Sequence, residues 1–185
     1  DSQAYNNRGY TYGILGQFRR AIEDFDQAVL KDLGNVEAYT NRGLAYRELG
    51  QPQRAIEDLD VAIQTNPAHH VAYSNRGLAY ADLGRYREAI SDYNEAIVLE
   101  PTNAQTYINR GLAHGNLGLA DKAVEDSQVA ISLAPELANA YAARAMAYTR
   151  LGRDGEAERD AETAVQLGFD RLALRGIINQ LKEGR

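Results

Sequence analysis

The stretch NRGLAY occurs twice without change, at Asn41–Tyr46 and at Asn75–Tyr80, and near copies begin at Asn7 and Asn109. The copies are spaced by 34 residues, and a fifth copy at residues 143–145 reads Ala-Arg-Ala. A fixed period of this length is typical of a solenoid, in which each repeat buries its apolar face only by stacking on its neighbours. Other columns keep the same period: Tyr5, Tyr39, Tyr73, Tyr107 and Tyr141; Gly16, Gly50, Gly84, Gly118 and Gly152; Ala21, Ala55, Ala89, Ala123 and Ala157.

Composition restricts the class of protein and of partner. With 185 residues, 44% of them hydrophobic and 25% charged, the chain is long enough and apolar enough to bury a core. A net charge of −6 argues against nucleic acid as a partner, because binding phosphates requires a basic face. No segment approaches the roughly 18 consecutive apolar residues of a membrane-spanning helix, so we expect no membrane insertion. The absence of cysteine leaves no thiolate ligand for a metal.

Each repeat is predicted to be a pair of helices. Residues 36–65 have helical apolar spacing twice, with Gly50 after the first run and Pro52 at the start of the second. Glycine just beyond a helix supplies the left-handed conformation that ends it, and proline in a first turn loses no hydrogen bond. Three prolines close the second helices of the middle repeats: Pro67, Pro101 and Pro135.

These columns resemble those of the tetratricopeptide repeat, on the following residues of the second repeat: Tyr39, Gly43, Tyr46, Leu49, Gly50, Ala55, Leu59, Ala62 and Pro67. The chain departs from the family pattern mainly in having arginine before the glycine. The resemblance implies an all-α fold, a right-handed α-solenoid of five helix hairpins plus a C-terminal capping helix. The expected boundaries are residues 1–169 for the five repeats (2–35, 36–69, 70–103, 104–137 and 138–169) and 170–185 for the capping helix, whose outer face should be polar.

The arginine of each repeat is expected to be paired within the fold. It lies between two packing faces of the first helix, where an unpaired charge would be disfavoured, and an aspartate follows it by 16 residues in every repeat. Pairing with the aspartate of the preceding repeat is the alternative, but it would leave one charge unpaired at each end. The predicted structural ion pairs are Arg8 with Asp24, Arg42 with Asp58, Arg76 with Asp92, Arg110 with Asp126, and Arg144 with Asp160.

The asparagine column lies on the one face of the first helix that needs no packing contact. First helices line the concave surface of such a solenoid, so the amides should form a row beside a row of apolar side chains. An amide both donates and accepts hydrogen bonds, as an extended peptide backbone requires, and the family resemblance implies that role for the asparagines. The alternative is an exposed column repeated by duplication. The candidate peptide-binding residues are Asn7, Asn41, Asn75, Asn109, Tyr10, Leu44, Leu78, Leu112 and Met146.

One subtype of the family binds the acidic C-terminus of chaperones through asparagines plus cations. Here Gln3 stands at the lysine position of the first repeat, and Val71 and Asn75 stand where the third repeat would need cations, so an intact carboxylate clamp is not expected. Arg47 and Arg150 could still contact an acidic ligand and are added to the peptide-binding residues. Gly13 and Gly115 lie mid-helix near the groove, where they could give a ligand room.

No residue pattern indicates catalysis, a metal site or a cofactor. His69 and His70 are adjacent on a helix and therefore point about 100° apart. His114 stands at a core aromatic position with Ser127 at the partner position, which predicts a buried hydrogen bond between them rather than a nucleophile.

The sequence therefore predicts a non-enzymatic module that binds a protein or an extended peptide in its concave groove. Two alternatives remain open. The chain could self-associate as an assembly scaffold through its open N-terminal repeat, or it could be the targeting domain of a larger enzyme. The compartment is not fixed by the sequence; we expect a cytoplasmic location, although an N-terminal targeting segment could precede this chain.

Overall fold

The computed structural model describes residues 1–184, which form eleven helices and no strand. No helix within these residues is both long and apolar enough to cross a membrane. The helices fall into two compact units, an N-terminal unit Asp1–Leu99 and a C-terminal unit that begins at Glu100. The fold class is all-α, built of helical hairpins as in a solenoid.

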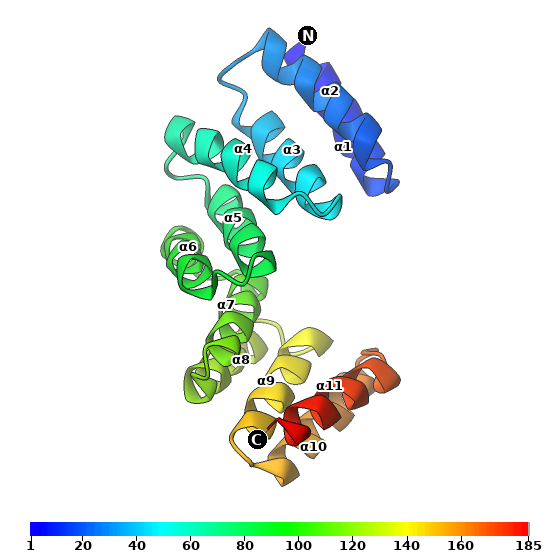
Figure 1. The fold of residues 1–185 in the computed structure, drawn as a ribbon, viewed down its shortest axis with the longest axis vertical. Coiled ribbons are helices and arrows are strands. Elements are labelled where there is room, and N and C mark those ends of the chain that lie inside the picture. Colours follow the sequence, from blue (N-terminus) through cyan, green and yellow to red (C-terminus); the bar gives the residue numbers. More distant parts are fainter. Residues whose placement is uncertain (185) are drawn as a thin grey trace. The chain divides into compact units, whose positions relative to one another are not determined.

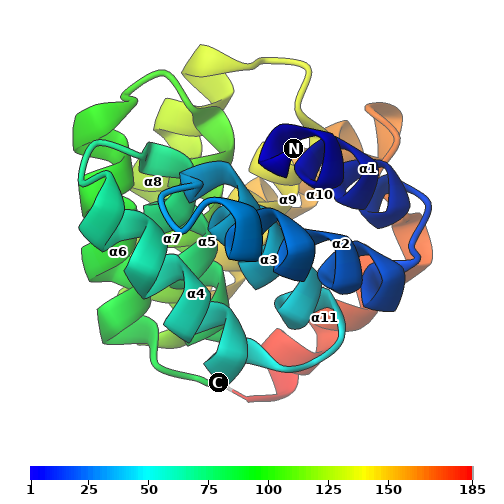
Figure 2. The same cartoon turned by 90° about the horizontal axis from the view of Figure 1, so that it is seen from above.

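The N-terminal unit consists of three antiparallel hairpins, and the helices of each hairpin lie side by side (Figures 1 and 2). The first helix of each later hairpin packs on the second helix of the hairpin before it. The helices are α1 (Ser2–Ile14), α2 (Phe18–Lys31), α3 (Val36–Glu48), α4 (Pro52–Thr65), α5 (His70–Asp82) and α6 (Tyr86–Leu99).

The C-terminal unit contains two more hairpins and one further helix. The last helix, α11, packs mainly on α9 and stands away from α10. Each hairpin lies inside one of the ranges expected from the sequence. The helices are α7 (Ala104–Asn116), α8 (Ala120–Leu133), α9 (Ala138–Arg150), α10 (Asp154–Gln166) and α11 (Arg171–Glu183).

Glycine and proline set the helix ends as the sequence predicts. Gly50 follows α3 with φ 71°, a left-handed conformation that side chains rarely adopt, and Pro52 is the first residue of α4. At the other end of α3, the Asn35 side chain accepts a hydrogen bond of 2.9 Å from the Ala38 backbone N–H. These local signals place each hairpin turn independently of its neighbours.

Close helix packing in the core depends on small residues. A Cβ atom at Gly43 would lie 2.9 Å from Leu59 Cγ, and one at Gly77 would lie 2.6 Å from Tyr93 Cε1. Both contacts are shorter than van der Waals packing permits, so glycine is required for the two helices of a hairpin to approach. Ala38 and Ala72, at equivalent positions of α3 and α5, are fully buried.

The outer face of α11 is not uniformly polar, contrary to the expectation for a cap. Leu174 is 1% exposed and packs against Ala142 and Ala164, but Leu172 is 80% exposed. At about 100° per residue, position 172 lies on the opposite side of the helix from position 174. Leu172 and Leu174 therefore cannot both face the core.

Candidate functional site

Each repeat arginine is bonded to the aspartate 16 residues later, on the second helix of its own hairpin. In Arg42, Nε donates to Asp58 Oδ2 at 2.7 Å and Nη2 donates to Asp58 Oδ1 at 2.6 Å. The shortest distance is between 2.6 and 2.7 Å in all five pairs, and all five aspartates are buried. Hydrogen bonds with Asp92 raise the pKa of Arg76 above its ordinary value, so this guanidinium stays charged.

Arg42, Arg76 and Arg144 each have a second partner that the sequence pattern did not predict. Arg42 Nη1 donates to Asp26 at 2.6 Å, and Arg76 Nη1 donates to Asp60 at 2.6 Å. In the C-terminal unit, Arg144 Nη1 donates to Gln128. These acceptors belong to the preceding repeat, but to a different column from the predicted aspartates. The EDFD and EDLD runs contain both columns, and this two-residue spacing is the signal that could have revealed them.

Arg8 differs from the other arginines in its exposure. Its side chain is 60% exposed, whereas the side chains of the other four are 15 to 20% exposed. Each arginine also lies over the tyrosine three residues before it, with Cζ 5.4 to 5.8 Å from the ring centroid. In every repeat the arginine thus contacts an aspartate and a tyrosine. Among the five repeat arginines, Arg8 is the most exposed to solvent.

The four asparagines have different hydrogen-bond partners. Asn41 Nδ2 donates to Oδ1 of buried Asn6 at 3.0 Å, which gives Asn41 a structural bond as well. Asn7 and Asn109 each accept a hydrogen bond of 2.9 Å from the glutamine four residues earlier. Within residues 1–184, no hydrogen bond involves the Asn75 side chain, which is half-buried. The amides therefore retain hydrogen-bonding groups, although not the same ones in each repeat.

The N-terminal unit has an apolar hollow of about 320 Å³ beside Asn41. Tyr10 and Leu44 from the predicted apolar row line it, and they are 56% and 37% exposed. The amide and apolar residues predicted from the sequence thus meet at one concave place in this unit. Other lining residues, Ile14, Phe18 and Glu48 among them, were not predicted; Gly13, noted for its mid-helix position, also lines the hollow, and a Cβ there would meet nothing within 4 Å.

The remaining residues of the predicted apolar row are less accessible to a ligand. Leu78 is half-buried. Leu112 and Met146 pack against the core cluster that contains Ile108, Ala140 and Ala143. The row is therefore not a uniform strip, and its exposed part lies at Tyr10 and Leu44.

The two arginines proposed to contact an acidic ligand are already engaged. Arg47 Nε donates to Asp82 at 2.7 Å, and its Nη1 donates to Glu48 at 3.1 Å. Arg150 Nη2 donates to Asn116 at 3.0 Å. A Cβ at Gly115 would lie 3.1 Å from Arg150 Nη1, so this glycine makes room for the arginine of the next repeat.

The predicted hydrogen bond between His114 and Ser127 is wrong. His114 Nδ1 lies 2.9 Å from Asp126 Oδ2, while Ser127 Oγ donates to the Ala123 carbonyl at 2.8 Å. A buried serine on a helix can satisfy its hydroxyl within its own helix, and the histidine then takes the nearby carboxylate. Asp126 therefore serves both Arg110 and His114.

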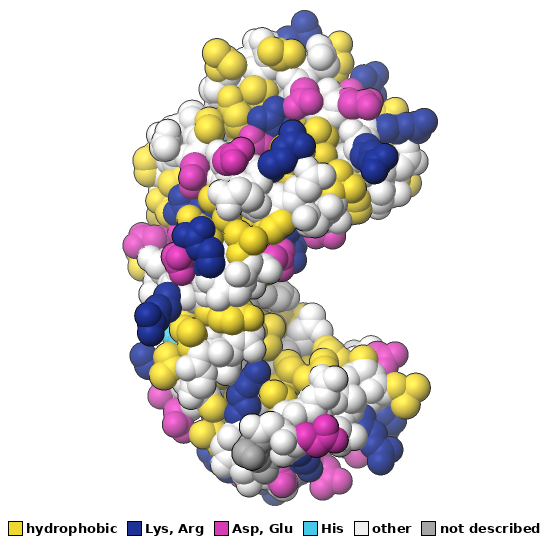
Figure 3. Space-filling view, viewed as in Figure 1, with side chains coloured by type: hydrophobic (Ala, Val, Ile, Leu, Met, Phe, Trp, Pro, Cys, Tyr) yellow, Lys and Arg dark blue, Asp and Glu magenta, His cyan; other side chains and the backbone are white. Residues whose placement is uncertain are grey.

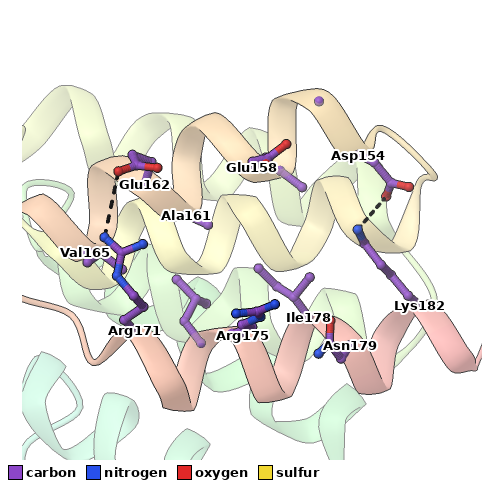
Figure 4. A pocket seen from close by; sticks show the side chains of 13 residues that line it. Asp154, Glu158, Ala161, Glu162, Val165, Arg171, Arg175, Ile178, Asn179 and Lys182 are labelled. Carbon is purple, nitrogen blue, oxygen red and sulfur yellow. Dashed lines mark ion pairs between the residues drawn. The ribbon is translucent and has the colours of Figure 1, made fainter.

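A second hollow, of about 540 Å³, lies between α10 and α11 (Figure 4). Acidic side chains from α10 face basic side chains from α11 across it, and its floor includes Leu174 and Ile178. Two ion pairs join the walls, Arg171–Glu162 at 3.8 Å and Lys182–Asp154 at 3.9 Å. We call this hollow the α10–α11 cleft.

Comparison with known families agrees with the repeat geometry. Profiles described as tetratricopeptide repeat match residues 6–70, 104–137 and 138–167, and one described as TPR repeat matches residues 77–118. The chain belongs to the tetratricopeptide repeat family. Its fold and family are those of protein–protein interaction modules. No curated protein sequence matches the chain.

Several solved tetratricopeptide structures are similar to this one. MamA is 28% identical with a TM-score of 0.76, covering 90% of this chain and 91% of its own. TTC0263 of Thermus thermophilus is 23% identical with a TM-score of 0.80, covering 98% of each chain. YrrB, described as a TPR protein with an unusual peptide-binding site, is 17% identical with a TM-score of 0.73, covering 99% of this chain and 92% of its own.

Proposed function

We propose that this chain binds an extended segment of a partner protein, with an apolar side chain of that segment inserted in the hollow of the N-terminal unit. The observation that carries the proposal is the exposure of Tyr10 and Leu44 around a concave apolar space. Exposed aromatic and aliphatic side chains that surround a hollow are typical of the anchor pockets of interaction surfaces. YrrB shares only the fold at 17% identity, so the side chains of this chain carry the proposal.

The amide of Asn41, which lines the hollow, and that of Asn75, at the same position one repeat later, suit the main chain of such a segment. Asn41 donates one side-chain N–H to Asn6, and its side-chain carbonyl oxygen can still accept a hydrogen bond. The side-chain amide of Asn75 makes no hydrogen bond to another described residue, so both its N–H and its C=O can bond to a peptide. A peptide in extended conformation has N–H and C=O groups that remain unpaired unless the binding surface supplies partners. The asparagines supply both kinds of partner at the spacing of the repeat.

The charges near the hollow favour a neutral or basic segment. Glu48 lines the hollow, and Arg47 is shared between Glu48 and Asp82, so these three groups carry a net charge of −1. An acidic chain end would be repelled by the surplus carboxylate. On the face shown in Figure 3, side chains of both signs are interspersed.

The test begins with a random-peptide display library panned on the chain, followed by fluorescence anisotropy on the selected peptides. Tyr10→Ala should weaken binding by roughly 2 kcal/mol, about thirtyfold, because it removes an exposed anchor contact. Asn75→Ala should weaken it by about 1 kcal/mol without loss of helicity. Asn75 is a cleaner test than Asn41, whose removal would also leave the buried Asn6 amide without its donor.

The matched control is Gln53→Ala, an exposed change on α4 away from the hollow. It should leave both the affinity and the circular dichroism unchanged. Selected peptides that bind the Tyr10 and Asn75 variants as tightly as the original chain would refute the proposal.

A second candidate is self-association through the exposed side of α1. Ala4 and Thr11 are exposed, whereas Ala38 and Ala45, their counterparts one repeat later, are buried against the preceding hairpin. Arg8 is exposed on the same side. A second copy could cover this face as one hairpin covers the next. Light scattering over a range of concentrations tests it: Ala4→Glu should shift an oligomer to monomer, and a monomer at every concentration would refute it.

A further inference from the structure

The α10–α11 cleft arises because the fifth repeat has lost large side chains that most of the other repeats keep. Position 158 is glutamate where the second, third and fourth repeats have Ile56, Ile90 and Val124. Likewise, Ala161 replaces the bulky side chain represented by Leu59 in the second repeat. A shortened or charged side chain at these positions cannot fill the space between α10 and the next helix. The cleft is therefore a property of this repeat and not of the fold.

The two walls of the cleft have opposite charge. Asp154, Glu158 and Glu162 follow one another at four-residue spacing and so lie on one face of α10 (Figure 4). The opposite wall carries three cations from α11: Arg171, Arg175 and Lys182. Three acids face three bases, so the cleft as a whole is neutral and favours neither a simple anion nor a simple cation.

These charges face each other without close pairing. The Arg171–Glu162 and Lys182–Asp154 pairs span 3.8 and 3.9 Å, and their side chains are 45 to 63% exposed. Exposed pairs at such distances contribute little. In the middle of the cleft, neither Glu158 nor Arg175 takes part in an ion pair with any residue in the range 1–184. Glu158 and Arg175 are therefore open to an occupant that carries both signs.

The floor of the cleft is apolar. Ala157 and Leu174 are 2% and 1% exposed, and half-buried Val165 and Ile178 lie beside them. The volume of about 540 Å³ falls within the roughly 300 to 1,000 Å³ of ligand pockets. Between Arg171 and Lys182 the helix rises by roughly 16 Å, which matches about five residues of extended chain.

We infer that the α10–α11 cleft binds a short bipolar segment of a partner protein, net neutral, in which an apolar side chain separates a cation from a carboxylate. The cation faces Glu158, the carboxylate faces Arg175, and the apolar side chain rests on Leu174 and Ile178. This site is separate from the hollow beside Asn41, so it does not depend on the function proposed above.

The test uses the full chain and three fluorescein-labelled peptides of equal length that contain leucine with alternating lysine and glutamate, with lysine only, or with glutamate only. Fluorescence anisotropy at low salt should show the mixed peptide binding at least about fivefold tighter than either single-sign peptide. Added salt at about 0.5 M should abolish the difference, because exposed charges are screened. Equal binding of the three peptides, or no binding of the mixed one, would overturn the inference.

Variants locate the binding to the cleft. Glu158→Lys and Arg175→Glu should each weaken binding of the mixed peptide about fivefold. The charge-swapped double variant should recover it, since positions 158 and 175 then carry opposite charges again. Glu125→Lys, an exposed change on α8, is the control. Asn75→Ala should have no effect on this peptide. Binding that resists both single substitutions would place the peptide elsewhere and contradict the inference.

Discussion

At the scale of the residue, the arginine column shows how one side chain can join two repeats. Arg42 is held by Asp58 of its own hairpin and by Asp26 of the hairpin before it. Because the Arg42 side chain is only 15% exposed and Asp58 is buried, the bond between them forms where water competes weakly, whereas Asp26 is 45% exposed. Arg8 is bonded to the equivalent aspartate of its own hairpin, Asp24, but its side chain is 60% exposed. The two arginines therefore form a natural comparison.

Arg42→Met should lower the free energy of unfolding by about 3 kcal/mol, because it leaves buried Asp58 without its counter-ion. Arg8→Met should produce a smaller loss, since solvent reaches the side chain that it replaces. Urea unfolding followed by circular dichroism measures both. Equal losses in the two variants would show that neither the second partner of Arg42 nor its burial contributes to the free energy of unfolding.

At the scale of the element, α11 is attached through few contacts. Leu174 is its one buried residue in the described part of the chain, and it packs on Ala142 of α9 and Ala164 of α10. The cleft removes much of the packing that α10 would otherwise supply. We therefore expect α11 to open locally more readily than α9.

Leu174→Ala should speed hydrogen exchange of the α11 amides by roughly a hundredfold, which corresponds to about 3 kcal/mol for a leucine-to-alanine change in a core. Mass spectrometry of exchanged peptides resolves α11 from α9. The matched control is Leu172→Ala on the same helix, where the side chain is 80% exposed and exchange should not change. Unchanged protection in the Leu174 variant would show that the charged walls, and not this contact, hold the helix.

At the scale of the whole molecule, the chain is a series of similar hairpins whose contacts within each compact unit run from one hairpin to the next. Stability in such an array is approximately a sum of repeat and nearest-neighbour contributions. Arg42 and Leu174 belong to different compact units and share no partner. Arg42 and Asp58, in contrast, are bonded to each other.

The combination of Arg42→Met with Leu174→Ala should therefore lower the free energy of unfolding by the sum of the single losses, within about 0.5 kcal/mol. Arg42→Met combined with Asp58→Asn should cost clearly less than the sum, because the second change removes the charge that the first left unpaired. Urea unfolding of the single variants and the two doubles measures this. Coupling between positions 42 and 174 would contradict the nearest-neighbour description.

Much of the site could not be predicted from the sequence. The pattern predicted Asn41, Tyr10 and Leu44 but not Ile14 or Phe18, because it does not show which side chains from two hairpins surround one space. The other residues of the apolar row were expected to line the groove as Tyr10 and Leu44 do, yet Leu112 and Met146 pack against a core cluster. The α10–α11 cleft could have been suspected from Glu158 standing in an isoleucine or valine column, although its size depends on where α11 lies.

The sequence by itself determined the repeat, its period and the two helices of each hairpin, because helix caps, glycine turns and apolar spacing act over a few residues and recur at 34-residue spacing. It also determined one arginine partner, since a matched aspartate recurs 16 residues later. Tertiary structure alone decided the second partner of each bridging arginine, the hydrogen bond of His114 and the two hollows. These depend on distances between side chains of different helices, and such distances are set by packing in three dimensions rather than by any local pattern.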